Sequence, residues 1–189
     1  MSQSQFQPQN QPQSGAGDPL LGAARIVLLL FSIAIIFGMV MLGIGITVLL
    51  TIGRAAVLSR ILAADAPGIA YWGVIAAFGL LAGLLYLGLR FVRELDGIVG
   101  SVSEGDPFRA ENADRLSRMG WIAIIAELVA LPIAALSAWF TPYLERAGSH
   151  VDVDFGLNGE TVLLILVLFI LARVFREGAR LKADLEGTV

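Results

Sequence analysis

Four long runs of apolar residues, almost free of charge, constrain this chain more than any other feature of its sequence. The runs cover about residues 26–52, 69–89, 119–143 and 157–175. A helix rises about 1.5 Å per residue, so about twenty apolar residues cross a hydrocarbon core of about 30 Å. We therefore predict an all-α integral membrane four-helix bundle, with four spans, over residues 20–189. A hydrophobic share of 57% and a charged share of 15% exclude an ordinary soluble enzyme.

Residues 1–19 differ in composition from the rest of the chain. They are rich in Gln and Pro, and no Lys or Arg precedes Arg25. A signal peptide has a basic start followed by a short apolar core, which this segment lacks. We predict a disordered tail, because such a composition cannot bury enough apolar surface to offset the entropy of ordering.

The basic residues are distributed unevenly between the two sides of a four-span protein. Most of the thirteen Lys and Arg lie in the N-terminal tail, the loop 90–118 and the tail 176–189. Short loops rich in Lys and Arg stay in the cytoplasm. We therefore predict that the loop and both termini are cytoplasmic. Trp121 at one end of the third run and Trp139 at the other suit the two membrane interfaces.

The loop 90–118 is predicted to be helical. Gly105-Asp106-Pro107 predicts a helix start, with Asp106 as N-cap and Pro107 at the first helical position, and the helix would run through Arg118. Glu111 suits the first turn of such a helix. Phe108, Asn112 and Arg115 then share one helix face. Two interpretations stay open: a structural hairpin between two spans, and a docking surface for a cytoplasmic protein.

Glu127 is the one carboxylate within a predicted span. An ion at that depth is costly, so we expect it to be protonated, paired or directed into a wet cavity. A packing hydrogen bond and a proton or cation site are the two interpretations. The second would make the protein a small transporter or channel, with copies of the chain forming the pore. Gly79 and Gly83 permit close helix approach, within one chain or in a homo-oligomer.

The sequence offers little support for catalysis. The chain has no Cys and a single His, His150, which follows Ser149 in an acidic loop with Asp152 and Asp154. We find no metal-spaced cluster, phosphate-binding Gly loop or catalytic pair, so we expect no enzyme activity, cofactor or metal. A net charge of -3 argues against direct nucleic-acid binding.

Two motifs resemble a known family. The first is Gly105-Asp-Pro-Phe-x-x-Glu-Asn-x-x-Arg-Leu-x-x-Met-Gly-Trp121. The second is Val174-Phe-Arg-Glu-Gly178, together with the terminal Asp184-Leu-Glu-Gly-Thr-Val189. From about Ala23 to Val189 the chain resembles a small bacterial membrane family, domain of unknown function 2975. The resemblance implies four spans in a bacterial cytoplasmic (inner) membrane and no established activity. It also implies a small helix-turn-helix regulator as cytoplasmic partner.

The motifs carry opposite charges on the same predicted side. Arg176 and Arg180 are expected to reach Glu104, Asp106 or Glu111, so that the loop and the tail form one cytoplasmic unit. We therefore expect a non-enzymatic membrane protein that tethers or regulates a cytoplasmic partner. The candidate interaction residues are Asp106, Pro107, Phe108, Glu111, Asn112, Arg115, Arg176 and Glu177, and Glu127 is the candidate for transport.

Overall fold

The computed structural model describes residues 19–146 and 158–187, and every regular element in these ranges is an α-helix. The elements are α1 (Pro19–Thr51), α2 (Arg54–Ala63), α3 (Ala70–Ser103), α4 (Ala110–Arg146) and α5 (Gly159–Glu186). The all-α prediction is confirmed for this part of the chain. The prediction of a disordered segment at 1–19 falls almost entirely outside the described residues.

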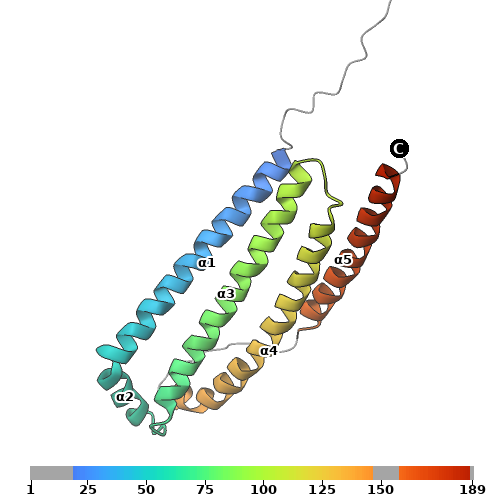
Figure 1. The fold of residues 1–189 in the computed structure, drawn as a ribbon. Helices are drawn as coiled ribbons and strands as arrows, with labels where there is room; N and C mark the ends of the chain where they lie inside the picture. Colours follow the sequence, from blue (N-terminus) through green and yellow to red (C-terminus); the bar gives the residue numbers. More distant parts are fainter. Residues whose placement is uncertain (1–18, 147–157, 188–189) are drawn as a thin grey trace, which may run out of the picture.

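The four long helices follow one another in space in the order of the chain. Figure 1 shows α1, α3, α4 and α5 from left to right, and the main contacts join α1 to α3, α3 to α4 and α4 to α5. The guanidinium of Arg25 donates a hydrogen bond to the Ser103 hydroxyl at 2.9 Å. The start of α1 therefore lies beside the end of α3, at the same end of the molecule as the end of α5 (Figure 1).

Within the described residues, three helices are long and apolar enough to cross a membrane: α1, α3 and α4. Their large apolar side chains point outward, as with Phe37 on α1 and Leu128 on α4. Such surfaces suit contact with lipid and would be unusual in a soluble protein of this size. Three of the four predicted spans thus correspond to helices able to span, and the protein has the character of a membrane protein.

The helix α5 is not among the helices that are long and apolar enough to cross a membrane. Its uncharged stretch, from Thr161 to Ala172, is short and lies between Glu160 and Arg173. The rings of Trp121 and Phe169 lie with centroids 6.0 Å apart, which fixes the position of α5 along α4. The first residue of α5 lies about 15 Å beyond this level, whereas Trp139 lies about 27 Å beyond it. Between the levels of Trp121 and Trp139, α5 therefore lies beside only about half of the length of α4.

The predicted loop helix does not exist as a separate element. The helix α3 continues to Ser103, and α4 begins at Ala110 and runs without interruption to Arg146. The prediction of a start at Asp106-Pro107 is wrong, because Pro107 lies in a turn and Asp106 binds basic side chains instead of capping a helix. The chain leaves α3 through Gly105, whose φ of 80° is the left-handed region that glycine adopts without strain.

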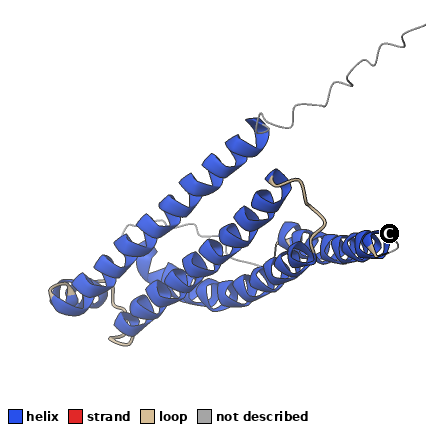
Figure 2. Cartoon of the chain, turned by 45° about the horizontal axis from the view of Figure 1, so that its top comes forward, coloured by secondary structure: helices blue, strands red, loops and turns tan. Residues whose placement is uncertain are grey.

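The short helix α2, at the other end of the molecule, was not predicted from the sequence. It lies between α1 and α3, in the segment between the first two predicted spans, which contains Arg54 and Arg60. Its Ile61 packs with Leu49, Ala70 and Tyr71 in an apolar cluster. The Tyr71 hydroxyl donates to the Leu49 carbonyl oxygen at 3.1 Å, which ties α3 to α1. Figure 2, the view turned by 45°, shows α2 as the short helix at the end of α1.

Candidate functional site

The residues singled out from the sequence lie mainly in one unit, which we call the cap. The cap comprises the facing ends of α3 and α4 with their connection (residues 94–118) and the end of α5 (residues 173–186). Its base is an apolar cluster of Leu116, Met119, Leu168 and Ala172, against which Phe91, Leu95, Ile98 and Phe175 pack. The ends of three helices are thus joined by one small core.

Asn112 is the most deeply buried polar side chain of the cap, with 1% of its surface exposed. Its amide group donates to the Ser101 hydroxyl at 2.5 Å and to the Pro107 carbonyl oxygen at 2.8 Å. The first contact joins α4 to α3, and the second fixes the turn between them. Asn112 therefore holds the connection in shape, and it is not available to a partner.

Phe108 connects the turn to α5. Its ring lies 5.4 Å from the ring of Phe175, centroid to centroid, and 45% of the residue is exposed. A Cβ atom added at Gly178 would lie 2.7 Å from Phe108 Cδ1. Both family-like motifs therefore meet here, since Phe108 belongs to the first and Phe175 and Gly178 to the second. The small size of Gly178 is what permits the approach.

Asp106 is the centre of an ionic cluster at the tip of the cap. Its carboxylate accepts hydrogen bonds from Lys182 Nζ at 2.8 Å and from Arg109 Nε at 3.3 Å. Arg109 also forms an ion pair with Glu104 at 2.8 Å. The hydrogen bond from Lys182, with help from Arg109, lowers the pKa of Asp106 below its ordinary value of 3.8. Sequence reasoning missed Lys182, the single lysine of the chain, because its partner Asp106 lies 76 residues away and no local pattern joins the two.

Two further arginines lie between α3 and α4. Arg118 Nε donates to Glu94 Oε1 and Arg118 Nη2 donates to Glu94 Oε2, both at 3.0 Å. This bidentate hydrogen bonding raises the pKa of Arg118. The half-buried Arg115 lies against Gly97, where an added Cβ would overlap its guanidinium group. Glu94 and Gly97 were not singled out from the sequence, because their partners lie about twenty residues away.

Ion pairs join the loop and the tail as expected, but most of the residues that form them differ from the expected ones. Arg176 Nη2 pairs with Asp114 at 3.4 Å, and Lys182 takes the place at Asp106 that was expected for Arg176 or Arg180. Glu111 and Glu177 are exposed, and neither forms a side-chain hydrogen bond or ion pair with the described residues. These two predicted cap residues therefore have exposed carboxylates that no described side chain pairs with.

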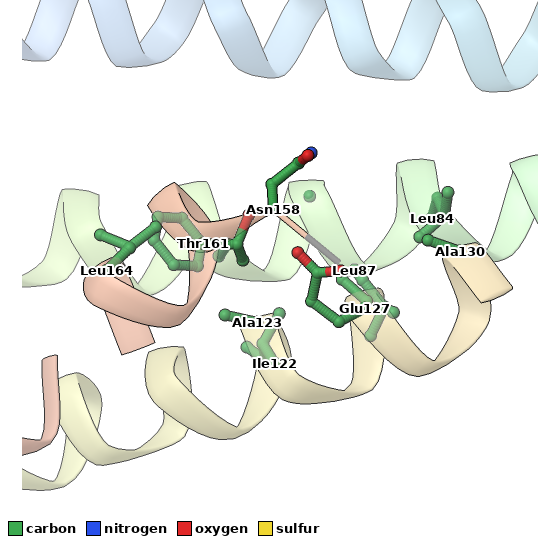
Figure 3. Close-up of a pocket in the computed structure, with 12 residues that line it drawn as sticks. Leu84, Leu87, Ile122, Ala123, Glu127, Ala130, Asn158, Thr161 and Leu164 are labelled. Atoms are coloured by element: carbon green, nitrogen blue, oxygen red, sulfur yellow. The ribbon is translucent and has the colours of Figure 1, made fainter. Parts of the chain in front are cut away.

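Glu127 lies away from the cap, in a cavity between α3, α4 and α5. The cavity has a volume of about 340 Å³. Its wall is apolar apart from Glu127, Asn158 and Thr161. Figure 3 shows the Glu127 carboxyl group directed from α4 toward the first turn of α5, where Asn158 and Thr161 lie. Within the described residues, Glu127 makes no side-chain hydrogen bond or ion pair.

The described residues also bear on whether the protein could hold a metal ion. No group of three or more His, Cys, Asp or Glu is placed there to hold a metal ion. The segment with Ser149, His150, Asp152 and Asp154 lies outside the described residues. The interactions described in the cap are ion pairs, hydrogen bonds and apolar packing.

Comparison with known proteins supports the motif resemblance. A search of curated proteins and a search of solved structures each found no similar protein. A family model described as protein of unknown function (DUF2975) matches residues 57–189, from within α2 to the end of the chain. The match starts later than the resemblance from Ala23 had suggested, so it leaves out α1. It includes both motifs of the cap, and it covers well over half of the chain. The chain belongs to this family, protein of unknown function (DUF2975).

Proposed function

We propose that this protein is a non-enzymatic, four-span protein of the bacterial cytoplasmic membrane whose cap docks a cytoplasmic protein. Both termini lie in the cytoplasm in this proposal. The partner class that the family resemblance suggests is a small helix-turn-helix regulator, which the protein would tether or inhibit.

The observation that carries the proposal is the size and bracing of the cap. Two antiparallel helices can be joined by about two to eight residues. Here the connection itself is short, yet α3 and α4 both continue about 15 Å or more beyond the level of Trp121 before they are joined. Asn112, Phe108 and Arg118 brace this extension internally. A chain that needed only to connect two spans would not require it.

The path of the chain supports a fourth crossing. α4 ends at Arg146, at the end of the molecule where α2 lies (Figure 1). Lys182 contacts Asp106 at the opposite end. The chain therefore returns along the whole molecule between Arg146 and Lys182, although α5 alone is short for a span. With α1, α3 and α4 this makes four crossings, and the basic residues favour the cap side as cytoplasmic.

The surface proposed for docking lies on the outside of the cap. It combines Glu111 on α4 with Glu177 and Leu181 on α5, and 58% of Leu181 is exposed. Exposed charges around an apolar residue are typical of the rim and centre of a protein interface. The inward residues Asn112 and Arg115 would support this surface without touching the partner.

Photo-crosslinking in cells tests the proposal. A photoreactive residue is introduced singly at Glu111, Glu177 or Leu181, and at the exposed Leu62 of α2 as a control at the other end. We expect one discrete adduct with a cytoplasmic protein at the cap positions and none at Leu62. Mass spectrometry then identifies the protein, and fractionation shows whether it is in the membrane fraction only when this chain is present. A partner that stays soluble in the presence of the chain, or an absence of cap adducts, contradicts the proposal.

Transport is the second candidate function. The observation that favours it is the cavity at Glu127, since a carboxyl group in an apolar wall is a recurring feature of membrane transport sites. The two halves of the chain show no clear inverted repeat, which makes this candidate the weaker one.

A further inference from the structure

The cavity between α3, α4 and α5 has the composition of a binding site. About 340 Å³ lies at the lower end of the range of about 300–1,000 Å³ that is usual for small-molecule sites. Such sites combine an apolar wall with a few convergent polar groups. Here Leu84, Leu87 and Phe91 of α3 contribute to the wall, while Glu127 and Thr161 contribute polar groups.

The charge of the cavity comes from one group. Between Trp121 and Trp139, α4 has no charged residue except Glu127. Its carboxyl group is directed into the cavity and has no side-chain partner among the described residues (Figure 3). A carboxylate in apolar surroundings is costly unless a cation accompanies it. The cavity therefore favours a positively charged occupant.

The remaining wall restricts the kind of cation. An inorganic ion requires several oxygen ligands to replace its water, whereas this cavity supplies one carboxyl group, one amide and one hydroxyl. The leucine side chains cannot coordinate such an ion, but they favour contact with the hydrocarbon part of an organic molecule. Phe91, the one aromatic residue of the wall, offers a ring to which an organic cation is attracted.

Access to the cavity is from the side of the molecule. α5 begins at Gly159, about halfway along α4, and the first turn of α5 forms one rim of the cavity. At this rim Asn158 is exposed and Leu164 is 44% exposed. In the proposed topology this rim lies at the level of the membrane, so a molecule entering here would come from the lipid phase and would have to be soluble in it.

We propose that this cavity binds an amphipathic organic cation, with its apolar body against the leucines of α3 and its positive charge beside Glu127. This site adjoins the base of the cap at Phe91, but the proposal does not depend on the docking function. The proposal concerns binding, and it holds whether or not the ligand is carried across the membrane.

Binding of radiolabelled tetraphenylphosphonium to the full chain in lipid nanodiscs tests the proposal. Empty nanodiscs are used to subtract partition into lipid. We expect saturable binding that Glu127→Gln weakens by at least about tenfold, because the charge partner is removed. Glu160→Gln is the matched control. Glu160 lies in the first turn of α5 at a similar depth, but it does not line the cavity, so we expect little change.

Two further arms separate the alternatives. Ala130→Phe fills the cavity while leaving the carboxyl group in place, and it should also abolish saturable binding. Neutral triphenylphosphine oxide should bind weakly and to the same extent with and without Glu127→Gln.

Absence of saturable binding in the unmodified chain would show that Glu127 only helps to pack α5. Equal binding by Glu127→Gln, or equal affinity for the neutral probe, would show that the groove merely accepts apolar molecules. Either result overturns the proposal.

Discussion

At the scale of single residues, Asn112 illustrates how the cap is fixed. Its amide group is enclosed and satisfies both the Ser101 hydroxyl and the Pro107 carbonyl oxygen. Asn112→Ala removes both hydrogen bonds and leaves the buried Ser101 hydroxyl and the partly buried Pro107 carbonyl oxygen without this donor. We expect a loss of about 1–3 kcal/mol in the free energy of unfolding. A denaturant titration of the solubilised protein measures it.

Glu111→Ala is the control for this change, since the side chain of the neighbouring Glu111 is exposed and makes no hydrogen bond or ion pair with the described residues. Exposed substitutions of this kind usually change stability by less than about 0.5 kcal/mol. If Asn112→Ala and Glu111→Ala were equally stable, the enclosed hydrogen bonds would have no structural role.

The ion pair of Asp106 with Lys182 makes attachment of the α5 end dependent on pH. The pKa of Asp106 is lower in the folded protein than its ordinary 3.8, mainly through the hydrogen bond from Lys182. The stabilisation is therefore complete at pH values above 3.8 and is lost as the pH falls through the lower, folded value. A nitroxide label at Ala183 reports this attachment through its mobility.

In this experiment, Asp106→Asn should leave the label more mobile than the unmodified chain at pH 7. The difference between the two proteins should disappear as the pH falls through the folded pKa of Asp106, which lies below 3.8, because the unmodified carboxylate is then also neutralised. Equal mobility of the two proteins at pH 7 would mean that the ion pair does not hold α5.

At the scale of elements, contact between α5 and the α3–α4 turn depends on a glycine. A Cβ atom at Gly178 would overlap the Phe108 ring, whereas one at Gly79 of α3 would meet nothing within 4 Å. We expect Gly178→Ala to destabilise the protein by about 1–3 kcal/mol through overpacking. Gly79→Ala should be neutral or stabilising by up to about 1 kcal/mol, because alanine favours a helix.

The combination of Gly178→Ala with Phe108→Ala isolates this contact, because the truncated ring leaves room for the new methyl group. The double variant should be more stable than the sum of the two single changes predicts. Strict additivity in the same titration would indicate that the two residues do not meet.

The elements also show what a sequence can predict. α1, α3 and α4 were expected because a long apolar run is a local signal that needs no knowledge of partners. α2 was missed because its segment, which contains Arg54 and Arg60, lies between two long apolar runs and is not itself such a run, although Ile61 packs against α3. The start of α4 was placed too early, at Asp106, because a capping pattern cannot reveal that a lysine distant in sequence will bind the same carboxylate.

For the candidate site, the same distinction holds. The sequence identified Phe108, Asn112 and Arg176 by motif and charge, but it could not supply Ser101 or Gly178 as their partners or neighbours. The position of α5 along α4 was also unpredictable, because it is set by ring contacts such as that of Trp121 with Phe169. That position is what forms the cavity at Glu127.

At the scale of the whole molecule, the proposed topology predicts which residues face each side of the membrane. The chain has no Cys, so single cysteines can be introduced for labelling. With a membrane-impermeant maleimide on intact cells, Leu62→Cys in α2 should react. Glu111→Cys and Glu177→Cys should react only after the membrane is permeabilised. Labelling of Glu177→Cys in intact cells would place the end of α5 outside and exclude the four-span topology.

The central claim is that the two motifs of the family form one folded cap. Nitroxide labels on cysteines at Glu111 and Glu177, which are both exposed, report directly on the separation of α4 and α5 within it. In lipid nanodiscs, pulsed electron paramagnetic resonance should give one narrow distance distribution, which broadens when Gly178→Ala is added. A broad distribution without that substitution would show that the loop and the tail move independently, and it would contradict the claim.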